Sequence, residues 1–252
     1  QENDVPFTTS NFPIIIINTG GNAIVDDPKI TADISIIDNG PGMQNHPDDP
    51  PNNFEGKIDI SIRGSSSQMF PKKQYSVELR DDEGEDLEAS LLGMPEEEDW
   101  VLFAPYNDKS LMRDVLAYRL GNDLSQYSPR TKFCEVMLNG KYQGVYVLIE
   151  KIKRDKNRVD INKLDPDEVS GNNLTGGYII KIDKTTGSGG DGWVSSYPPL
   201  PNPLDQQIFF QYETPEEDEI VAEQKAYIQQ YVSEFENVLA GPDFDDPDDG
   251  YA

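Results

Sequence analysis

Alternating apolar and polar positions predict several β-strands in the first third of the chain. Residues 30–37 and 57–63 carry an apolar side chain at almost every second position, and residues 13–18 form a short apolar run. These patterns are typical of strands that bury one or both faces. Residues 74–80 alternate in the same way, so we expect them to pair antiparallel with 57–63 across a loop of about ten residues. Residues 40–53 are rich in proline and polar side chains, which predicts a loop.

A helix and a β-hairpin are predicted in the middle of the chain. Asp108 is of a residue type that caps helices, and apolar residues follow it at helical spacing until about Gly121. Residues 131–138 and 143–150 are rich in Val, Tyr and Phe and flank an Asn-Gly pair at 139–140. Because Asn and Gly tolerate the backbone angles of a tight turn, these two segments are predicted to form a hairpin.

The last third is predicted to contain one strand, a long loop and a long helix. Residues 176–183 have a strand pattern, and residues 187–203 are rich in Gly, Ser and Pro, which predicts a loop around Trp193. Residues 216–239 have acidic side chains in the first turn and an apolar and aromatic stripe at helical spacing, so we expect a helix that turns this stripe to the core.

Composition and charge exclude several classes of protein. The 252 residues, 36% of them hydrophobic, suffice for a sizeable core. One cysteine and one histidine leave no scope for an intramolecular disulfide, a thiolate zinc cluster or a two-histidine metal site. The net charge of −26 disfavours nucleic-acid binding, and no apolar run is long enough for membrane insertion. Residues 100–160 are locally basic, with 11 Lys and Arg against 7 Asp and Glu, so one cationic cleft for an anionic ligand is still compatible with the composition.

The loop after the strand at 57–63 contains the residue types that phosphate sites use. It consists of Arg63, Gly64, Ser65, Ser66, Ser67 and Gln68, and it ends with Lys72 and Lys73. Glycine allows close backbone approach, hydroxyls donate hydrogen bonds, and Arg and Lys supply positive charge. The spacing of a Walker loop is absent, and the alternative is an ordinary surface loop with its lysine stems along the surface.

Other polar residues have both a chemical and a structural interpretation. Asp108 is explained as a helix cap, whereas Arg113 interrupts an apolar pattern and either faces a cleft or forms a salt bridge. Glu150 ends an apolar strand, where it either pairs with Lys73, as a kinase glutamate pairs with its lysine, or lies at a solvated edge before the basic residues that follow. Asp183 ends the strand at 176–183, either as a magnesium ligand or as a solvent-exposed strand end.

Four long segments, in the same order along the chain, resemble the spore-coat CotH kinase family. They are residues 62–79, 91–120, 134–161 and 175–184. The resemblance implies an atypical, secreted protein-kinase-like fold that binds ATP with magnesium. It also implies transfer of the γ-phosphate to Ser or Thr of extracytoplasmic or cell-surface proteins in bacteria.

The same resemblance implies roles for individual residues. The catalytic residues would be Lys73, Glu150 and Arg113, with Glu150 orienting the lysine. The nucleotide would be bound by Arg63, Gly64, Ser65, Ser66, Ser67, Lys72, Asn107 and Asp108. Asp183 would be the metal ligand.

The end of the chain departs from the family pattern. The family carries Asn-x-Asp and Trp-Asp-Phe/Leu-Asn motifs with its catalytic and metal-binding aspartates, and neither occurs in residues 185–252. We therefore expect an α+β chain with an antiparallel sheet lobe and a partly represented helical lobe, which lacks these two motifs. The expected divisions are a nucleotide-side lobe and core at 13–184, a loop at 185–214, a helix at 215–240 and an acidic linker at 241–252. The alternative is a non-catalytic surface or coat scaffold, or an adhesion module, with the same fold.

Overall fold

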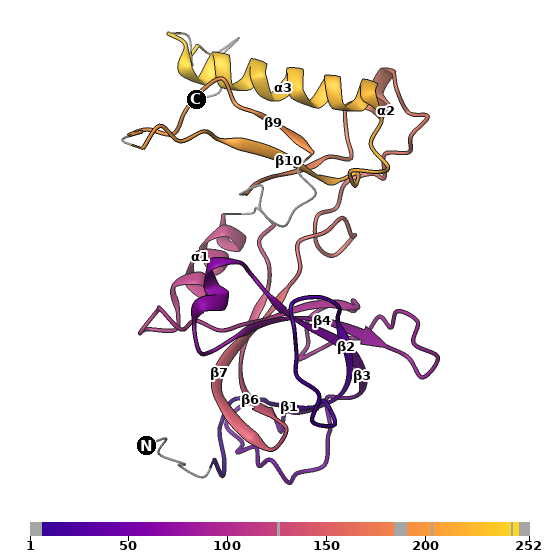
Figure 1. Ribbon diagram of the computed structural model, residues 1–252, viewed down its shortest axis with the longest axis vertical. Coiled ribbons are helices and arrows are strands. Elements are labelled where there is room, and N and C mark those ends of the chain that lie inside the picture. The colour runs from indigo at the N-terminus through magenta and orange to yellow at the C-terminus, as the bar shows by residue number, and fades with distance from the viewer. Residues whose placement is uncertain (1–6, 125–126, 184–190, 203, 243, 247–252) are drawn as a thin grey trace. The chain divides into compact units, whose positions relative to one another are not determined.

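The chain is divided into two compact units, residues 1–152 and 153–252. The computed structural model describes residues 7–124, 127–183, 191–202, 204–242 and 244–246 (Figure 1). Each unit is described by itself below. The part of the predicted linker at 247–252 lies outside the described residues.

Seven strands of the first unit form a closed barrel (Figure 1). The strands are β1 (Ile14–Asn18), β2 (Ile30–Ile37), β3 (Phe54–Arg63), β4 (Gln74–Arg80), β5 (Asp99–Phe103), β6 (Thr131–Leu138) and β7 (Lys141–Glu150). Their order round the barrel is β1-β2-β3-β4-β5-β7-β6. All neighbours are antiparallel except β1 and β6, whose parallel pairing closes the barrel.

Alternate residues of every strand fill the barrel with one apolar core. Ile58, Ile60, Trp100 and Tyr146 are at most 1% exposed and belong to this core. The period-2 pattern of the strands therefore matches a sheet whose inner face is buried all the way round.

Helix α1 (Arg113–Asp123) covers part of the outer barrel surface. Val115 and Tyr118 pack against an outward-facing cluster of β5 and β7 that contains Val101, Val147 and Ile149. The opposite face of α1 carries an exposed apolar stripe, which consists of Met112, Leu116, Leu120 and Leu124.

The second unit combines a three-stranded sheet with one long helix (Figure 1). The sheet has the order β8-β10-β9 and is antiparallel, with β8 (Ile179–Ile182), β9 (Gly192–Val194) and β10 (Phe209–Thr214). A short helix α2 (Gly171–Leu174) precedes β8, and α3 (Ala222–Ala240) follows β10. Ile228 of α3 packs with Tyr212 and Ile220 into a small core.

The strands predicted for the first unit are confirmed. The bounds of β2, β4 and β6 agree with the prediction, and β3 and β4 pair antiparallel as expected. The predicted hairpin is formed by β6 and β7, and its turn residues Asn139 and Gly140 have φ angles of 50° and 75°. The α+β class is confirmed too, and among the described residues no helix is long and apolar enough to cross a membrane.

Two helix starts and one predicted loop differ from the prediction. Helix α1 begins at Arg113 rather than after Asp108, because Leu111 has a φ of 60°, which a right-handed helix excludes. Helix α3 begins at Ala222 rather than at 216, where the Gln224 side chain accepts a hydrogen bond from the Val221 N–H at 3.2 Å. Strands β9 and β10 lie within 185–214, which was expected to be a loop.

Candidate phosphate-binding site

A turn after β3 brings the predicted phosphate loop into a compact shape. Gly64 has a φ of 89°, which favours glycine, and a Cβ at this position would displace the Ser67 hydroxyl. A short 3₁₀ helix, η1 (Ser66–Met69), follows. The Gln68 side chain donates to the Gly64 carbonyl at 2.6 Å, and the Lys73 ammonium donates to the Gln68 carbonyl at 2.5 Å. The loop thus holds itself together with its own polar groups.

The loop also presents hydrogen-bond donors that the rest of the unit does not use. Within the described part of the chain, the hydroxyls of Ser65, Ser66 and Ser67 have no hydrogen-bond partner and the Arg63 guanidinium has no ion pair. Arg63 lies near Tyr118 of α1, whose pKa is raised by burial and by Asp114, while the Arg63 charge acts in the opposite direction. Three hydroxyls and one guanidinium are a donor set that suits phosphate oxygens.

Lys72 holds the loop against β7 rather than extending from it. Strand β5 ends at Phe103 opposite Val147, which leaves the earlier residues of β7 without a partner on that edge. The Lys72 ammonium donates to the Val145 carbonyl there and lies 4.3 Å from the centre of the Tyr146 ring. Burial lowers the pKa of Lys72, and its electrostatic interaction with Glu135 opposes this shift. The structure therefore gives Lys72 a positioning contact.

The segment after β5 lies at the same end of the barrel as the loop. The rings of Phe70 and Tyr106 stack with their centres 5.1 Å apart, which joins the two segments. Asn107 is exposed, and Asp108 is buried. The Arg113 guanidinium pairs with Asp108 at 3.5 Å but is 81% exposed. Predicted residues from two separate parts of the sequence are thus brought together.

The Asp108 carboxylate is used inside its own segment. It accepts hydrogen bonds from the Arg113 N–H at 2.9 Å, the Ser110 N–H at 3.0 Å and the Ser110 hydroxyl at 2.7 Å. These bonds, the one from the Arg113 N–H first, lower the pKa of Asp108 to about 2. Asp108 therefore satisfies the first N–H of α1 from outside the helix, but the N-cap position itself is Met112 and not Asp108 as predicted.

The predicted pairing of Lys73 with Glu150 is wrong. The registers place Glu150 level with Trp100 of β5 and Val77 of β4, so it lies two strands away from β4. Val77 is three residues beyond the start of β4, which puts Glu150 about 10 Å further along the barrel than the loop. Glu150 is buried and accepts from the Arg130 N–H and the Arg130 guanidinium, both at 2.8 Å.

Asp183 lies at the end of β8 in the second unit. Its side chain is exposed, and its carbonyl accepts a hydrogen bond from the Gln211 side chain at 3.0 Å. Its predicted role as a metal ligand stays a prediction.

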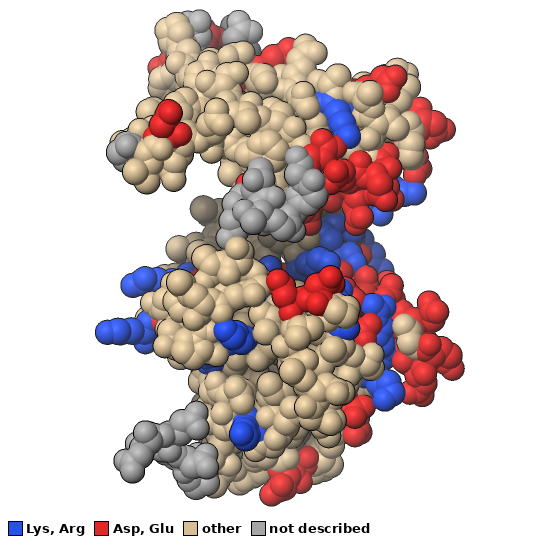
Figure 2. All heavy atoms as spheres, in the orientation of Figure 1, with Lys and Arg blue, Asp and Glu red and all other residues tan. Residues whose placement is uncertain are grey.

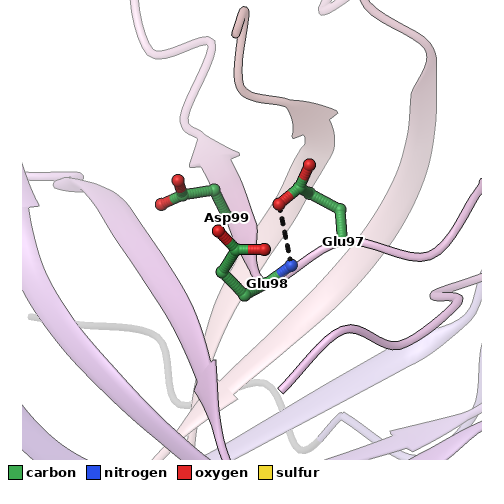
Figure 3. A group of neighbouring side chains, drawn as sticks. All are labelled: Glu97, Glu98 and Asp99. Carbon is green, nitrogen blue, oxygen red and sulfur yellow. Dashed lines mark hydrogen bonds between the residues drawn. The ribbon is translucent and has the colours of Figure 1, made fainter. Parts of the chain in front are cut away.

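A group of carboxylates near the start of β5 was missed in the sequence. Glu97, Glu98 and Asp99 each have an oxygen within 4.8 Å of the others, and the Glu97 carboxylate accepts from the Glu98 N–H at 3.1 Å (Figure 3). The Lys151 ammonium forms an ion pair with the Asp99 carboxylate at 3.1 Å. The acidic run at 96–99 was the visible signal for this group. The contact between Phe70 and Tyr106 had no visible signal in the sequence, because aromatic residues usually lie in the hydrophobic core.

A sequence model of the family described as "CotH kinase protein" matches residues 60–251, about three quarters of the chain. The chain belongs to the CotH kinase protein family. It is also 35% identical over 95 residues to the inner spore coat protein H of Bacillus subtilis (strain 168). That alignment covers 38% of this chain and 24% of the relative, so it spans about a quarter of the relative's length. The predicted family is therefore confirmed.

Proposed function

We propose that this CotH chain supplies the nucleotide-phosphate site of an atypical, kinase-like enzyme. The enzyme would transfer the γ-phosphate of ATP to Ser or Thr of a bacterial coat or surface protein. The observation that carries this proposal is the donor set of the loop, in which Arg63 and the three serine hydroxyls have no other described partner. Positioning and charge neutralisation are most of what phosphoryl transfer requires of a protein, and this loop offers both.

The residues at this end of the barrel fit phosphate better than they fit magnesium. Phosphate oxygens accept from hydroxyls and guanidinium groups. Magnesium requires oxygen ligands, and among the described residues of the loop there is no carboxylate. Asp108, an acid in the adjoining segment, already accepts from Ser110 and Arg113. The proposal therefore assigns the phosphates to Arg63 and Ser65–Ser67, and it leaves magnesium to the phosphate oxygens and to other acids.

The location and the protein substrate are part of the proposal. The relative's name places that protein in the inner spore coat, which supports a coat or surface location for this chain. A secreted or surface protein would then be the phosphate acceptor.

A second candidate is a coat or surface scaffold without catalytic activity. The observation that favours it is the pairing of Glu150 with Arg130 and of Lys73 with the Gln68 carbonyl. A kinase lysine must be oriented by its glutamate to bind the phosphates. In this chain the Lys73 ammonium and the Glu150 carboxylate bind other groups of the fold instead of each other.

Calorimetric titration with ATP and magnesium tests the nucleotide proposal. We expect Arg63→Ala to weaken binding by about 10- to 150-fold, since a charge-assisted hydrogen bond contributes about 1.5–3 kcal/mol. Arg119→Ala is the matched control, because Arg119 is 74% exposed and pairs only along the surface of α1 with Asp123. Equal affinity of Arg63→Ala and the unaltered chain would place the phosphates elsewhere.

The scaffold candidate makes the opposite prediction. If the chain is a scaffold, titration with ATP and magnesium gives no heat of binding, either with the unaltered chain or with a longer chain of the same protein. Heat that appears only with the longer chain would instead show that the nucleotide site needs residues outside this sequence.

A further inference from the structure

An aromatic groove on the second unit has no role in the proposed function. It has a volume of about 470 Å³, and its lining includes Gly176, Gly177, Tyr178, Tyr227, Ile228 and Tyr231. The ring centres of Tyr178 and Tyr227 are 6.0 Å apart, and those of Tyr227 and Tyr231 are 6.3 Å apart. Tyr231 is 51% exposed, so the row of rings opens to solvent. Rows of aromatic rings beside small residues are the surfaces that bind extended, proline-rich peptides.

The same chain carries a peptide of that kind. The Pro-rich segment, residues 197–202, reads Tyr-Pro-Pro-Leu-Pro-Asn. Leu200 in this segment is 90% exposed, and nothing in the described part of the unit covers it. Proline fixes its own φ and favours an extended conformation in the residue before it, so residues 197–199 lose little entropy when they bind.

Within one chain, the Pro-rich segment does not lie in the aromatic groove. The Tyr197 hydroxyl donates to the Asn237 side chain at 2.9 Å, and the Ser195 hydroxyl donates to Glu236. At about 100° per residue, Asn237 and Glu236 lie about 100° and about 160° round α3 from the midpoint between Tyr227 and Tyr231, and about 11 Å further along it. The segment and the groove therefore lie on different flanks of α3.

Both surfaces are uncharged in a strongly acidic protein. The residues that line the groove and those of the Pro-rich segment include no charged side chain, and burial raises the pKa of Tyr178 to about 12. Figure 2 shows a broad uncharged area over the second unit, with acidic side chains at its margins. Two copies that each carry a net charge of −26 repel one another, so a contact between neutral surfaces is the favourable one.

We propose that the Pro-rich segment of one copy binds in the aromatic groove of a second copy. The contact is head-to-tail, because different surfaces of the two copies meet. A chain of such contacts keeps one free groove at one end and one free segment at the other, so assembly continues beyond the dimer. This inference does not depend on nucleotide binding, and it provides either candidate function with a means of assembly.

Sedimentation velocity over a range of concentrations tests the contact. We expect species larger than a dimer, with dissociation constants between about 1 μM and 1 mM, as small interfaces give. Added salt is expected to strengthen the association, because it screens the repulsion between acidic copies. Tyr231→Ser removes a groove ring and Leu200→Asp places a charge on the segment, and each variant alone is expected to be monomeric. Both side chains are exposed, and far-UV circular dichroism checks that the variants fold.

Mixing the two variants is the decisive step. Tyr231→Ser retains the segment and Leu200→Asp retains the groove, so an equal mixture is expected to form one-to-one dimers and nothing larger. The control is Leu116→Asp, which places the same charge on the exposed apolar stripe of α1 and is expected to associate normally. A synthetic peptide of residues 194–202 is expected to bind the Leu200→Asp chain at least about tenfold more tightly than the Tyr231→Ser chain.

Three results would overturn the proposal. The first is an unaltered chain that stays monomeric up to about 1 mM. The second is association that is lost in Leu116→Asp and retained in Tyr231→Ser, which would place the contact on α1. The third is a mixture of the two variants that contains no dimer.

Discussion

Glu150→Gln tests whether the acid at the end of β7 is structural. Its side chain is fully buried, and its two oxygens accept separately from the N–H and from the guanidinium of Arg130. Glutamine keeps one acceptor and turns an NH₂ group toward the other donor. One hydrogen bond is then replaced by two donors that face each other in a buried site.

The expected loss follows from the strength of such bonds. A hydrogen bond to a charged group contributes about 1.5–3 kcal/mol, and a buried donor without a partner costs a similar amount. Arg130 is 44% exposed and can rehydrate, so we expect the free energy of unfolding to fall by about 2–3 kcal/mol. For a unit of 152 residues, this corresponds to a decrease of about 4–12 °C in Tm.

Thermal and urea unfolding, followed by circular dichroism, measure this loss. The control is Arg119→Gln, which breaks an exposed pair on α1 and is expected to cost less than about 0.5 kcal/mol. ATP affinity measured on the same samples is expected to be unchanged. A Tm within about 1 °C of the unaltered chain, together with weaker ATP binding, would refute the structural role and return Glu150 to the nucleotide site.

Two further predictions concern the same end of the barrel as the loop. Because hydrogen bonds lower the pKa of Asp108 from 3.8 to about 2 in the folded chain, its contribution to stability is complete above about pH 4 and is lost as the pH falls toward 2. Melting curves of Asp108→Asn and of the unaltered chain should therefore differ at neutral pH and converge over that interval, and a constant difference would contradict the reasoning. Gly64→Ala is expected to cost at least about 1–2 kcal/mol in urea unfolding, because alanine is disfavoured at a φ of 89° and its Cβ would meet the Ser67 Oγ. Adding Ser67→Ala should recover the steric part of that loss only, and full recovery would show that the backbone is not strained.

Strands with one buried face were predictable from the sequence, because burial of that face is what places an apolar residue at every second position. Residues 30–37 and 131–138 agree with β2 and β6 for this reason. Helix starts were predicted less well, since local contacts decide them. The positive φ of Leu111 and the capping contact of Gln224 move the two starts by four and six residues, and neither is visible as a pattern.

The sequence indicated which residues could form a candidate site, but it did not indicate how those residues pair. The loop of Arg63 and the segment of Asp108 lie at one end of the barrel, where Phe70 and Tyr106 join them. The partner of Glu150 depends on which strands are neighbours and on their register, and β5 lies between β4 and β7. A charge pattern along the sequence contains no information of that kind, so Arg130 was overlooked.

The parallel pairing of β1 with β6 has a consequence for biosynthesis. Ile14–Ile17 pair with residues 135–138, so one edge of β1 has no partner until about 120 further residues have been made, a delay of about 6–24 s at usual rates of translation. During that time an exposed edge of four isoleucines is available to other chains, which is a known route to aggregation. The nascent chain is therefore most vulnerable between the synthesis of β2 and that of β6, and a chaperone or rapid export that shields its first strand would act in that interval.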